Sequence, residues 1–296
     1  MLGVSLPQFT DDPAVMIDGA RRAVAAGLDS VWVFDHLWPL GGRKERPVLE
    51  CWSALAWLAA TTEHVNIGTL VTRSSLRHPA VLAKMAATVG AIAPGRVTIG
   101  IGSGDEASRA ENEAFGIPYY GSDERIDQLV STVRVLRRYL NEDVVTHHDR
   151  FADIEGLPAS PRPQPRPRVW VGGRSEQVLE VAGTEADGWN GWGGKPEVFA
   201  ADAQLVLDYA KDRPMDLSWG GQVVLGATDK AAEEKLGSRN PKHFIVGAPE
   251  TVAARLQEFI EAGARHLILG LPDAGTPGVY EFLAGNVRPM LQVPGR

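Results

Sequence analysis

A unit made of an amphipathic helix, a glycine and a short apolar strand recurs along the chain. Its three copies cover residues 20–34, 178–192 and 256–271. In each copy a glycine stands where the helical pattern ends: Gly27, Gly183 and Gly263. Glycine readily adopts the left-handed conformation that stops a helix, so we expect each of the three to end one. Helices that alternate with continuous apolar strands are typical of parallel sheets covered on both faces.

The same pattern extends over the whole sequence as eight strand and helix pairs. It predicts strands near 2–6, 30–34, 65–71, 96–101, 168–172, 187–191, 221–226 and 266–271. It predicts helices near 13–26, 50–61, 79–92, 123–140, 175–183, 196–211, 249–262 and 277–290. Eight such pairs favour an α/β fold of the (β/α)8 TIM barrel type, with short insertions, over an open doubly wound sheet. We expect residues 1–296 to form a single domain.

Two stretches interrupt the alternation. Residues 141–167 end in PASPRPQPRPR, whose prolines exclude a helix, so we predict a short hairpin followed by an extended connector. Residues 227–245 include TDKAAEEKLGSRN and read as a polar excursion after the seventh strand. Neither stretch is long enough to form a domain of its own.

Composition narrows the classes of partner. The chain has 30 Lys and Arg against 37 Asp and Glu, a net charge of −7, which argues against nucleic acid or an anionic membrane surface as partner. Its hydrophobic fraction of 44% is enough for a large core, and its single cysteine, Cys51, excludes an internal disulfide. The sequence has no apolar run of about 18 residues, and we expect a cytoplasmic protein with neither a signal peptide nor a membrane span.

In a (β/α)8 barrel the reactive groups follow the carboxyl ends of the strands, and the second strand is followed by VFDHLWP. His36 is there either an acid/base group or a structural hydrogen-bonding residue. Asp35 is either a partner of His36 or a direct ligand contact. The Gly- and Arg-rich loop at 39–48 could cover a ligand.

The third and fourth strands end in TLVTR and GIGSGD. Three alternating glycines in the second segment suit close approach of the backbone to a flat ligand, and Asp105 could accept a proton or a hydrogen bond at the mouth. Their spacing does not match a dinucleotide-binding loop. His78 and Pro79 belong to the start of the next helix.

After the fifth strand, Gly172 and Gly173 precede Arg174 and a helix that begins near Ser175. Amides at a helix start beside an arginine can bind a phosphate, although the same sequence also suits a tight turn with a serine cap.

Other candidate groups are better explained structurally. His147, His148 and Asp149 lie in the predicted hairpin, where neighbouring side chains point to opposite faces, so we expect a solvated turn and no metal site. Cys51 is expected to be a buried, inert thiol. Trp38, Trp192 and Tyr119 would suit an apolar or aromatic substrate if they line the mouth, and otherwise serve packing.

Four segments, in this order and spacing, resemble the luciferase-like monooxygenase superfamily and, within it, the oxidoreductases that depend on the deazaflavin coenzyme F420. They are VWVFDHLWP, VNIGTLVTRSSLRHPAVLAKMAATV, PGRVTIGIGSGD and RVWVGGRSEQVLEVAGTEADGWN. The similarity runs from GVSLPQF near the start to VGAPETVAARLQEFIEAGARHLIL near the end. It therefore covers nearly the whole chain.

The resemblance implies a barrel that holds the deazaflavin at its mouth, with the ring against the third strand. It also implies a non-prolyl cis peptide at the Thr69–Leu70 step and a homodimer. It gives His36 and Asp105 as catalytic candidates, with the shorter side chain of Asp105 a departure from the glutamate of a sugar-phosphate dehydrogenase of the family. The cofactor-binding residues it implies are Asp35, His36, Thr69, Leu70, Thr72, Gly102, Ser103, Gly104, Gly172, Gly173 and Arg174.

The function that follows is hydride transfer between coenzyme F420 and a small organic substrate. The lysines that hold the sugar phosphate in that dehydrogenase have no clear counterparts here, so the resemblance does not predict a phosphosugar. The alternatives are an FMN-dependent monooxygenase on the same barrel and a non-catalytic deazaflavin-binding protein. The Asp35–His36 pair favours the deazaflavin over FMN.

Overall fold

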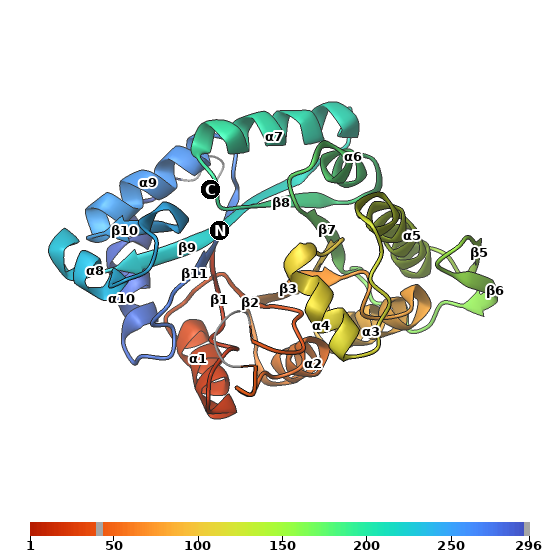
Figure 1. Ribbon diagram of the computed structural model, residues 1–296, viewed down its shortest axis with the longest axis horizontal. Helices are drawn as coiled ribbons and strands as arrows, with labels where there is room; N and C mark the ends of the chain where they lie inside the picture. The colour runs from red at the N-terminus through yellow and green to blue at the C-terminus, as the bar shows by residue number, and fades with distance from the viewer. Residues whose placement is uncertain (40–43, 293–296) are drawn as a thin grey trace.

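Eight parallel strands close into a barrel in the computed structural model, which describes residues 1–39 and 44–292. Around the barrel the order is β1-β2-β3-β4-β7-β8-β9-β11, and β11 pairs with β1 to complete the ring (Figure 1). The strands are β1 (Leu2–Ser5), β2 (Ser30–Val33), β3 (Asn66–Arg73), β4 (Val97–Gly102), β7 (Arg168–Gly172), β8 (Gly188–Trp192), β9 (Asp216–Leu225) and β11 (His266–Gly270). The predicted (β/α)8 barrel is confirmed.

Helices cover the outside of this ring (Figure 1). They are α1 (Pro13–Ala25), α2 (Cys51–Thr61), α3 (Pro79–Ile92), α5 (Ser122–Asn141), α6 (Glu176–Glu185), α7 (Pro196–Ala210), α9 (Pro249–Glu261) and α10 (Val279–Asn286). Local sequence explains several of their starts, because Asp12 and Glu50 accept amide hydrogen bonds at the first turns of α1 and α2. His78 does the same for α3, ahead of Pro79, as predicted.

Both predicted insertions contain regular structure. Strands β5 (Val144–His148) and β6 (Asp153–Pro158) form the expected antiparallel hairpin, which projects beside α5 (Figure 1). The second insertion differs from the polar excursion that we expected, because it contains helix α8 (Asp229–Leu236) and leads into strand β10 (Phe244–Gly247). Strand β10 pairs in parallel with the end of β9 and is an addition to the eight barrel strands.

Three predicted boundaries were wrong, and one of them is the end of the last helix, because α10 stops at Asn286 and not at 290. Strand β9 begins at Asp216, five residues before the predicted start at 221. Helix α6 continues to Glu185, so Gly183 does not end it. Gly183 instead lets α6 approach α7, since a Cβ there would lie 2.6 Å from the carbonyl oxygen of Val206. Gly27 and Gly263, in contrast, have the positive φ angles of 75° and 110° expected just after a helix.

Tryptophans packed against glycines fill the inside of the barrel. Trp32 and Trp170 stack with ring centroids 5.3 Å apart, and both are buried. A Cβ at Gly68 would clash with the ring of Trp32, and one at Gly188 would lie 2.6 Å from Trp170. These glycines therefore provide the volume that the indoles occupy. The interior of the barrel at this level is a packed core.

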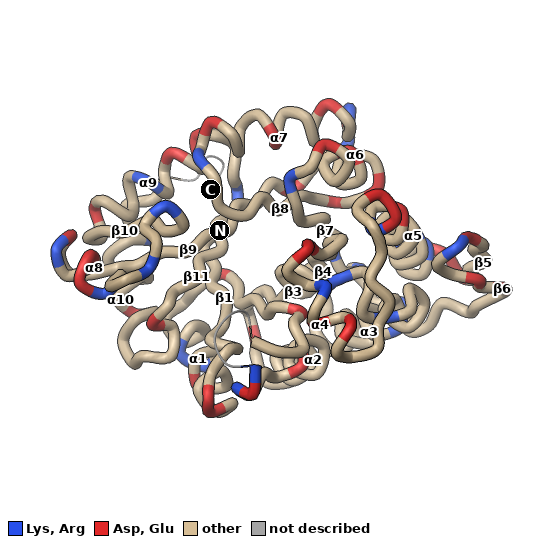
Figure 2. The backbone as a smooth tube through the Cα atoms, in the orientation of Figure 1, with Lys and Arg blue, Asp and Glu red and all other residues tan. Residues whose placement is uncertain are grey.

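Charged residues of both signs are spread over the outer helices and loops (Figure 2). None of the helices in the described parts of the chain is long and apolar enough to cross a membrane.

Candidate active site

A cavity of about 650 Å³ opens at the carboxyl ends of the barrel strands. This size is within the usual range for small-molecule and cofactor sites. Its lining includes side chains or backbone from β3, β4, β7, β8, β9 and the segments that follow β1, β2 and β11. Among the predicted site residues, those that line it are His36, Leu70, Gly102, Ser103, Gly104, Asp105, Gly172 and Gly173.

Strand β3 bulges where it borders the cavity. Its pairing with β4 shifts between Thr69 and Thr72, and the peptide between Leu70 and Val71 is cis. The predicted cis peptide at Thr69–Leu70 was therefore one residue too early. The Val71 side chain fits against glycines of β4 and β7, because a Cβ at Gly102 or Gly172 would lie 2.7 or 2.6 Å from it.

Thr69 and Thr72 flank the bulge and point away from the cavity. Thr69 Oγ1 donates to the carbonyl oxygen of Gly100 at 2.8 Å, and Thr72 Oγ1 accepts from the indole of Trp52 at 3.2 Å. Both side chains are buried, and neither residue lines the cavity. Their contacts tie the bulged strand to its neighbours.

One side of the cavity is lined mainly by glycine backbone. Gly102, Ser103 and Gly104 come from the end of β4, and Gly172 and Gly173 from the end of β7. Gly104 and Gly173 have φ angles of 73° and 136°, which side-chain-bearing residues rarely adopt. The Val71 side chain occupies the space in front of Gly102 and Gly172, so this side presents glycine backbone together with Val71 to a ligand. We call it the glycine-lined side.

Helix α6 begins next to the glycine-lined side. Ser175 caps it by accepting from the amide of Val178 at 3.4 Å. Arg174 does not line the cavity, because its Nε donates to Asp202 at 2.7 Å. The amide of Gly173 donates to the carbonyl oxygen of Asn190 at 3.3 Å. The serine-capped turn is confirmed, and a phosphate site at the start of this helix stays a prediction.

His36 is held in place by Glu111, a residue that sequence reasoning missed. His36 Nδ1 lies 2.9 Å from Glu111 Oε2, and the other carboxylate oxygen accepts from the amides of Leu37 and Trp38. Glu111 lies in the short helix α4 (Arg109–Ala114) and is 1% exposed. With Nδ1 bound to the carboxylate, Nε2 is the ring nitrogen left for a ligand.

Arg73 lies behind this pair and completes a buried ionic network. Its Nη2 is 3.0 Å from Glu111 Oε1, and its Nη1 donates to Asn112 at 2.9 Å. Burial alone would raise the pKa of Glu111, but the hydrogen bonds from His36 and Leu37 and the charge of Arg73 lower it. Burial in turn lowers the pKa of Arg73, against the opposing effect of Glu111 and Asp35. Glu111 is therefore an ionised group in a fixed position.

Asp35 belongs to this network and does not line the cavity. Arg77 binds both of its carboxylate oxygens, at 2.6 and 3.0 Å, and the amide of Arg73 donates to it at 3.2 Å. Of the two interpretations offered by the sequence, the structure places Asp35 neither against His36 nor against the cavity. Arg77 also bonds Glu50, the cap of α2, so the network links the mouth to the outer helices.

Asp105 lines the cavity and also caps a turn of 3-10 helix, η1 (Glu106–Ser108). Its Oδ1 accepts from the amide of Ser108 at 3.1 Å and from the hydroxyl of Ser108 at 2.9 Å. The side chain is exposed at the mouth. Capping explains its position without excluding contact with a ligand.

A second histidine, His266, lies deep inside the barrel. Trp32 Nε1 donates to Ser30 Oγ at 2.8 Å, so the Ser30 hydroxyl proton is free to donate to His266 Nε2, 2.6 Å away. The rings of Trp32 and Trp170 lie edge-on to it at 5.5 and 5.6 Å. Burial lowers its pKa to about 3, so the ring is neutral.

The remaining predictions have mixed outcomes. Cys51 is buried at the start of α2, as expected, and no cluster of metal ligands occurs in the described residues. His147 and His148 bind carboxylates of their own hairpin, at Asp149 and Asp153.

Trp192 lines the cavity, whereas Trp38 and Tyr119 do not. Residues 40–43 of the proposed covering loop lie outside the described residues.

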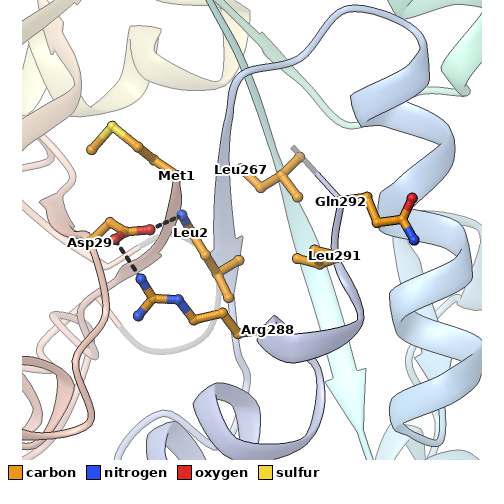
Figure 3. Close-up of a pocket in the computed structure, with 7 residues that line it drawn as sticks. All are labelled: Met1, Leu2, Asp29, Leu267, Arg288, Leu291 and Gln292. Atoms are coloured by element: carbon orange, nitrogen blue, oxygen red, sulfur yellow. Dashed lines mark hydrogen bonds and ion pairs between the residues drawn. The ribbon is translucent and has the colours of Figure 1, made fainter. Parts of the chain in front are cut away.

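A smaller cavity of about 230 Å³ lies at the opposite end of the barrel, where the strands begin (Figure 3). There Asp29 accepts from the amide of Leu2 at 2.7 Å and from Arg288 at 2.8 Å. Figure 3 shows these contacts converging on the Asp29 carboxylate. The group is held by structural contacts at the end of the barrel that does not carry active sites.

Comparisons with known proteins agree with this fold. An F420-dependent glucose-6-phosphate dehydrogenase of Kineococcus radiotolerans is 33% identical over 189 residues, 62% of this chain. That match spans 53% of the relative, so the chain covers only about half of its length. A phthiodiolone/phenolphthiodiolone dimycocerosates ketoreductase of Mycobacterium sp. (strain JLS) is 31% identical over 260 residues, 79% of this chain and 67% of the relative.

Among solved structures, an F420-dependent secondary alcohol dehydrogenase in complex with an F420-acetone adduct has the same fold. The TM-score is 0.86, and the match covers 99% of both chains at 20% identity. The sequence model of the family described as luciferase-like monooxygenase matches residues 2–245. The chain therefore belongs to the luciferase-like monooxygenase family.

Proposed function

We propose that this protein is an F420-dependent oxidoreductase that transfers a hydride between the deazaflavin and a small organic substrate. The observation that carries the proposal is the pairing, in one cavity, of a glycine-lined side beside the β3 bulge with a histidine held by a buried carboxylate. Relatives whose names include F420 dependence support the choice of cofactor.

The residues present fit such a cofactor. On the glycine-lined side, the backbone of Gly102, Gly104 and Gly172 borders the cavity, and the Val71 side chain lies against Gly102 and Gly172, so a flat ring would lie over Val71 beside this backbone. Leu70 and Val71 at the bulge would support the ring, and the first-turn amides of α6 next to Gly173 would hold its phosphate. Ser103 would add a hydroxyl contact. When bound, the deazaflavin accepts or donates the hydride at the carbon that replaces N5 of a flavin.

The chain itself supplies the group that moves the proton. We assign His36 as the acid/base group: in alcohol oxidation its Nε2 takes the hydroxyl proton as the hydride leaves carbon, and in carbonyl reduction it returns that proton. Glu111 fixes the ring of His36 through Nδ1, so no reorientation is needed during the step. Asp105, at the same cavity, is the second candidate for a proton role. Four residues that the sequence predicted to bind the cofactor do not line the cavity: Asp35, Thr69, Thr72 and Arg174. The role proposed for them is therefore to hold the elements around the cavity in place.

The test is a pair of binding titrations followed by one variant. Equilibrium dialysis against oxidised F420, and separately against FMN, should show tighter binding of F420. Single-turnover hydride transfer should then fall by about 10²–10⁴-fold in His36→Ala with F420 binding retained. His64→Asn is the matched control, because His64 is 95% exposed and remote from the cavity.

Each alternative has its own result. Preference for FMN with oxygen consumption would identify a flavin monooxygenase. F420 binding without turnover of any acceptor would identify a non-catalytic deazaflavin-binding protein. Full activity in His36→Ala would remove His36 from the mechanism. A single domain over residues 1–296, a homodimer and a cytoplasmic location stay predictions from the sequence.

A further inference from the structure

Three aromatic side chains form a wall across the mouth of the barrel. Phe34 follows β2, Trp192 ends β8, and their ring centroids are 6.0 Å apart at an angle of 80°. Three strands separate β2 from β8 in either direction around the barrel, so this contact spans the opening. Phe9, which follows β1, stacks on Phe34 at 5.7 Å and lies 6.3 Å from the ring of His36. We call Phe9, Phe34 and Trp192 the aromatic wall.

The aromatic wall is accessible from the cavity. All three rings line it, and Trp192 is 36% exposed, a large fraction for a tryptophan whose indole could have been buried in a core. Trp192 keeps its place by lying over Gly220, where a Cβ would come within 2.8 Å of the indole. A ligand beside a cofactor on the glycine-lined side therefore meets apolar ring surface next to His36.

The aromatic wall carries no charged group, and the charged side chains elsewhere in the cavity are bonded to other protein groups. Among the described residues that line the cavity, the ionisable ones are His36, Arg73 and Asp105. Arg73 is 3% exposed and bound to Glu111 and Asn112, and Asp105 accepts from Ser108. A phosphate dianion needs cationic or multiple amide donors, and beside the aromatic wall only the single ring nitrogen of His36 is left to serve it.

An uncharged polar group is available there instead. Gln222, on β9, lines the cavity and lies against Gly270, where a Cβ would be 2.6 Å from its Nε2. Its amide makes no hydrogen bond within the described parts of the chain, whereas the amide of Gln8 is fully bonded to Phe34 and Leu49. A free amide can donate to a carbonyl oxygen or accept from a hydroxyl.

We infer that the substrate is an uncharged carbonyl compound, or the corresponding alcohol, whose aromatic or alicyclic body lies on the aromatic wall. It differs from the phosphorylated sugar named for the relatives. The inference rests on the proposed function for its chemistry: reduction adds one hydride from the reduced deazaflavin to the carbonyl carbon and one proton from His36 to the oxygen. The binding site itself rests only on the cavity.

Calorimetric titration with acetophenone and with glucose 6-phosphate tests the inference, first on the protein alone and then with oxidised F420 present. Acetophenone should bind and glucose 6-phosphate should not. Trp192→Ala and Phe34→Ala should each weaken acetophenone binding at least tenfold, with Trp192→Leu as a milder variant and unchanged thermal melts as the check on folding. Val81→Ala is the control, since Val81 is a hydrophobic residue 54% exposed on the outside of α3.

Several results would overturn the inference: no acetophenone binding by the unaltered protein, tighter binding of glucose 6-phosphate, or equal acetophenone affinity in the wall variants. Failure of the proposed function is separable from these. If F420 does not bind while acetophenone binding still depends on Trp192, the cofactor assignment fails and the aromatic wall stands. If F420 binds and glucose 6-phosphate is turned over, the substrate class fails and the cofactor stands.

Discussion

The two histidines of the barrel make the same kind of contact in opposite surroundings. His36 follows the carboxyl end of β2 and bonds a carboxylate, with Arg73 behind it. His266 begins β11 at the other end of the barrel and bonds a hydroxyl, with two indoles around it. Each ring is fixed by its partner, but only His36 borders the large cavity.

The difference shows how position along a strand separates a reactive group from a packed one. At the mouth, the positive charge of Arg73 stabilises the negative charge of Glu111. The ionised carboxylate can therefore be held against the ring of His36, which faces the cavity. In the interior the hydrogen-bonding and ring partners of His266 are neutral, so desolvation dominates its pKa, with the N-terminal ammonium lowering it further and Asp29 opposing. A histidine in a barrel is thus informative only together with its neighbours.

Of the changes considered, the removal of Glu111 should lower stability and activity the most. Glu111→Ala leaves the Arg73 guanidinium buried with one fewer counter-charge, so we expect the free energy of unfolding to fall by about 3–5 kcal/mol. Chemical denaturation monitored by circular dichroism measures this change. Hydride transfer should fall as well, because His36 loses the group that orients it.

A charge-neutral variant separates the two roles of Glu111. Glu111→Gln keeps an acceptor for the amides of Leu37 and Trp38, so it should be more stable than Glu111→Ala while still lowering kcat. Glu113→Ala is the matched control, since Glu113 lies on the same helix and is exposed. Wild-type stability in Glu111→Ala would show that the network contributes nothing to folding.

Lowering the pH should reduce the stability of the folded protein through His266, over a defined pH range. The unfolded chain has an ordinary histidine pKa of about 6.5, whereas the folded pKa of His266 is about 3. Between these values the unfolded state binds a proton that the folded state does not, so stability falls as pH falls. The slope is at most about 1.4 kcal/mol per pH unit, which gives roughly 2 kcal/mol between pH 6.5 and 5.0.

His266→Gln should remove this pH dependence while keeping a hydrogen-bonding group near Ser30. Denaturation midpoints measured between pH 7 and 5 compare the two proteins above the range in which carboxylates such as Asp187 and Glu111 become protonated. An identical slope in His266→Gln and the unaltered protein would assign the effect to other groups.

The barrel could be predicted from sequence because its signal is local and repeated. Every predicted strand overlaps an observed one, and the glycine segments at Gly102 and Gly172 were correctly placed at the cavity. Gly183 was misjudged because its reason is a helix in contact with it, which no local pattern reveals. Strand β10 was missed since its four residues pair only with the end of β9.

The ionic network was harder to predict because its members are distant in sequence. His36 and Glu111 are 75 residues apart, and Asp35 and Arg77 are 42 apart. Sequence position gave Asp35 and His36 similar roles, yet consecutive residues after a strand point in different directions. Arg73 carried a usable signal, because it ends the third strand at the mouth, whereas Glu111 lies in a segment without a chemical pattern.

Asp105→Asn should give the smallest effect and decides whether the mouth has a second proton-transfer group. Asparagine caps about as well as aspartate, so the free energy of unfolding should change by less than about 0.5 kcal/mol. Because the carboxylate already serves Ser108, we expect kcat to fall by less than about tenfold, against about 10²-fold or more for a proton-transfer group. Steady-state kinetics with F420 measures the ratio, and a loss as large as that of His36→Ala would make Asp105 an equal partner in the chemistry.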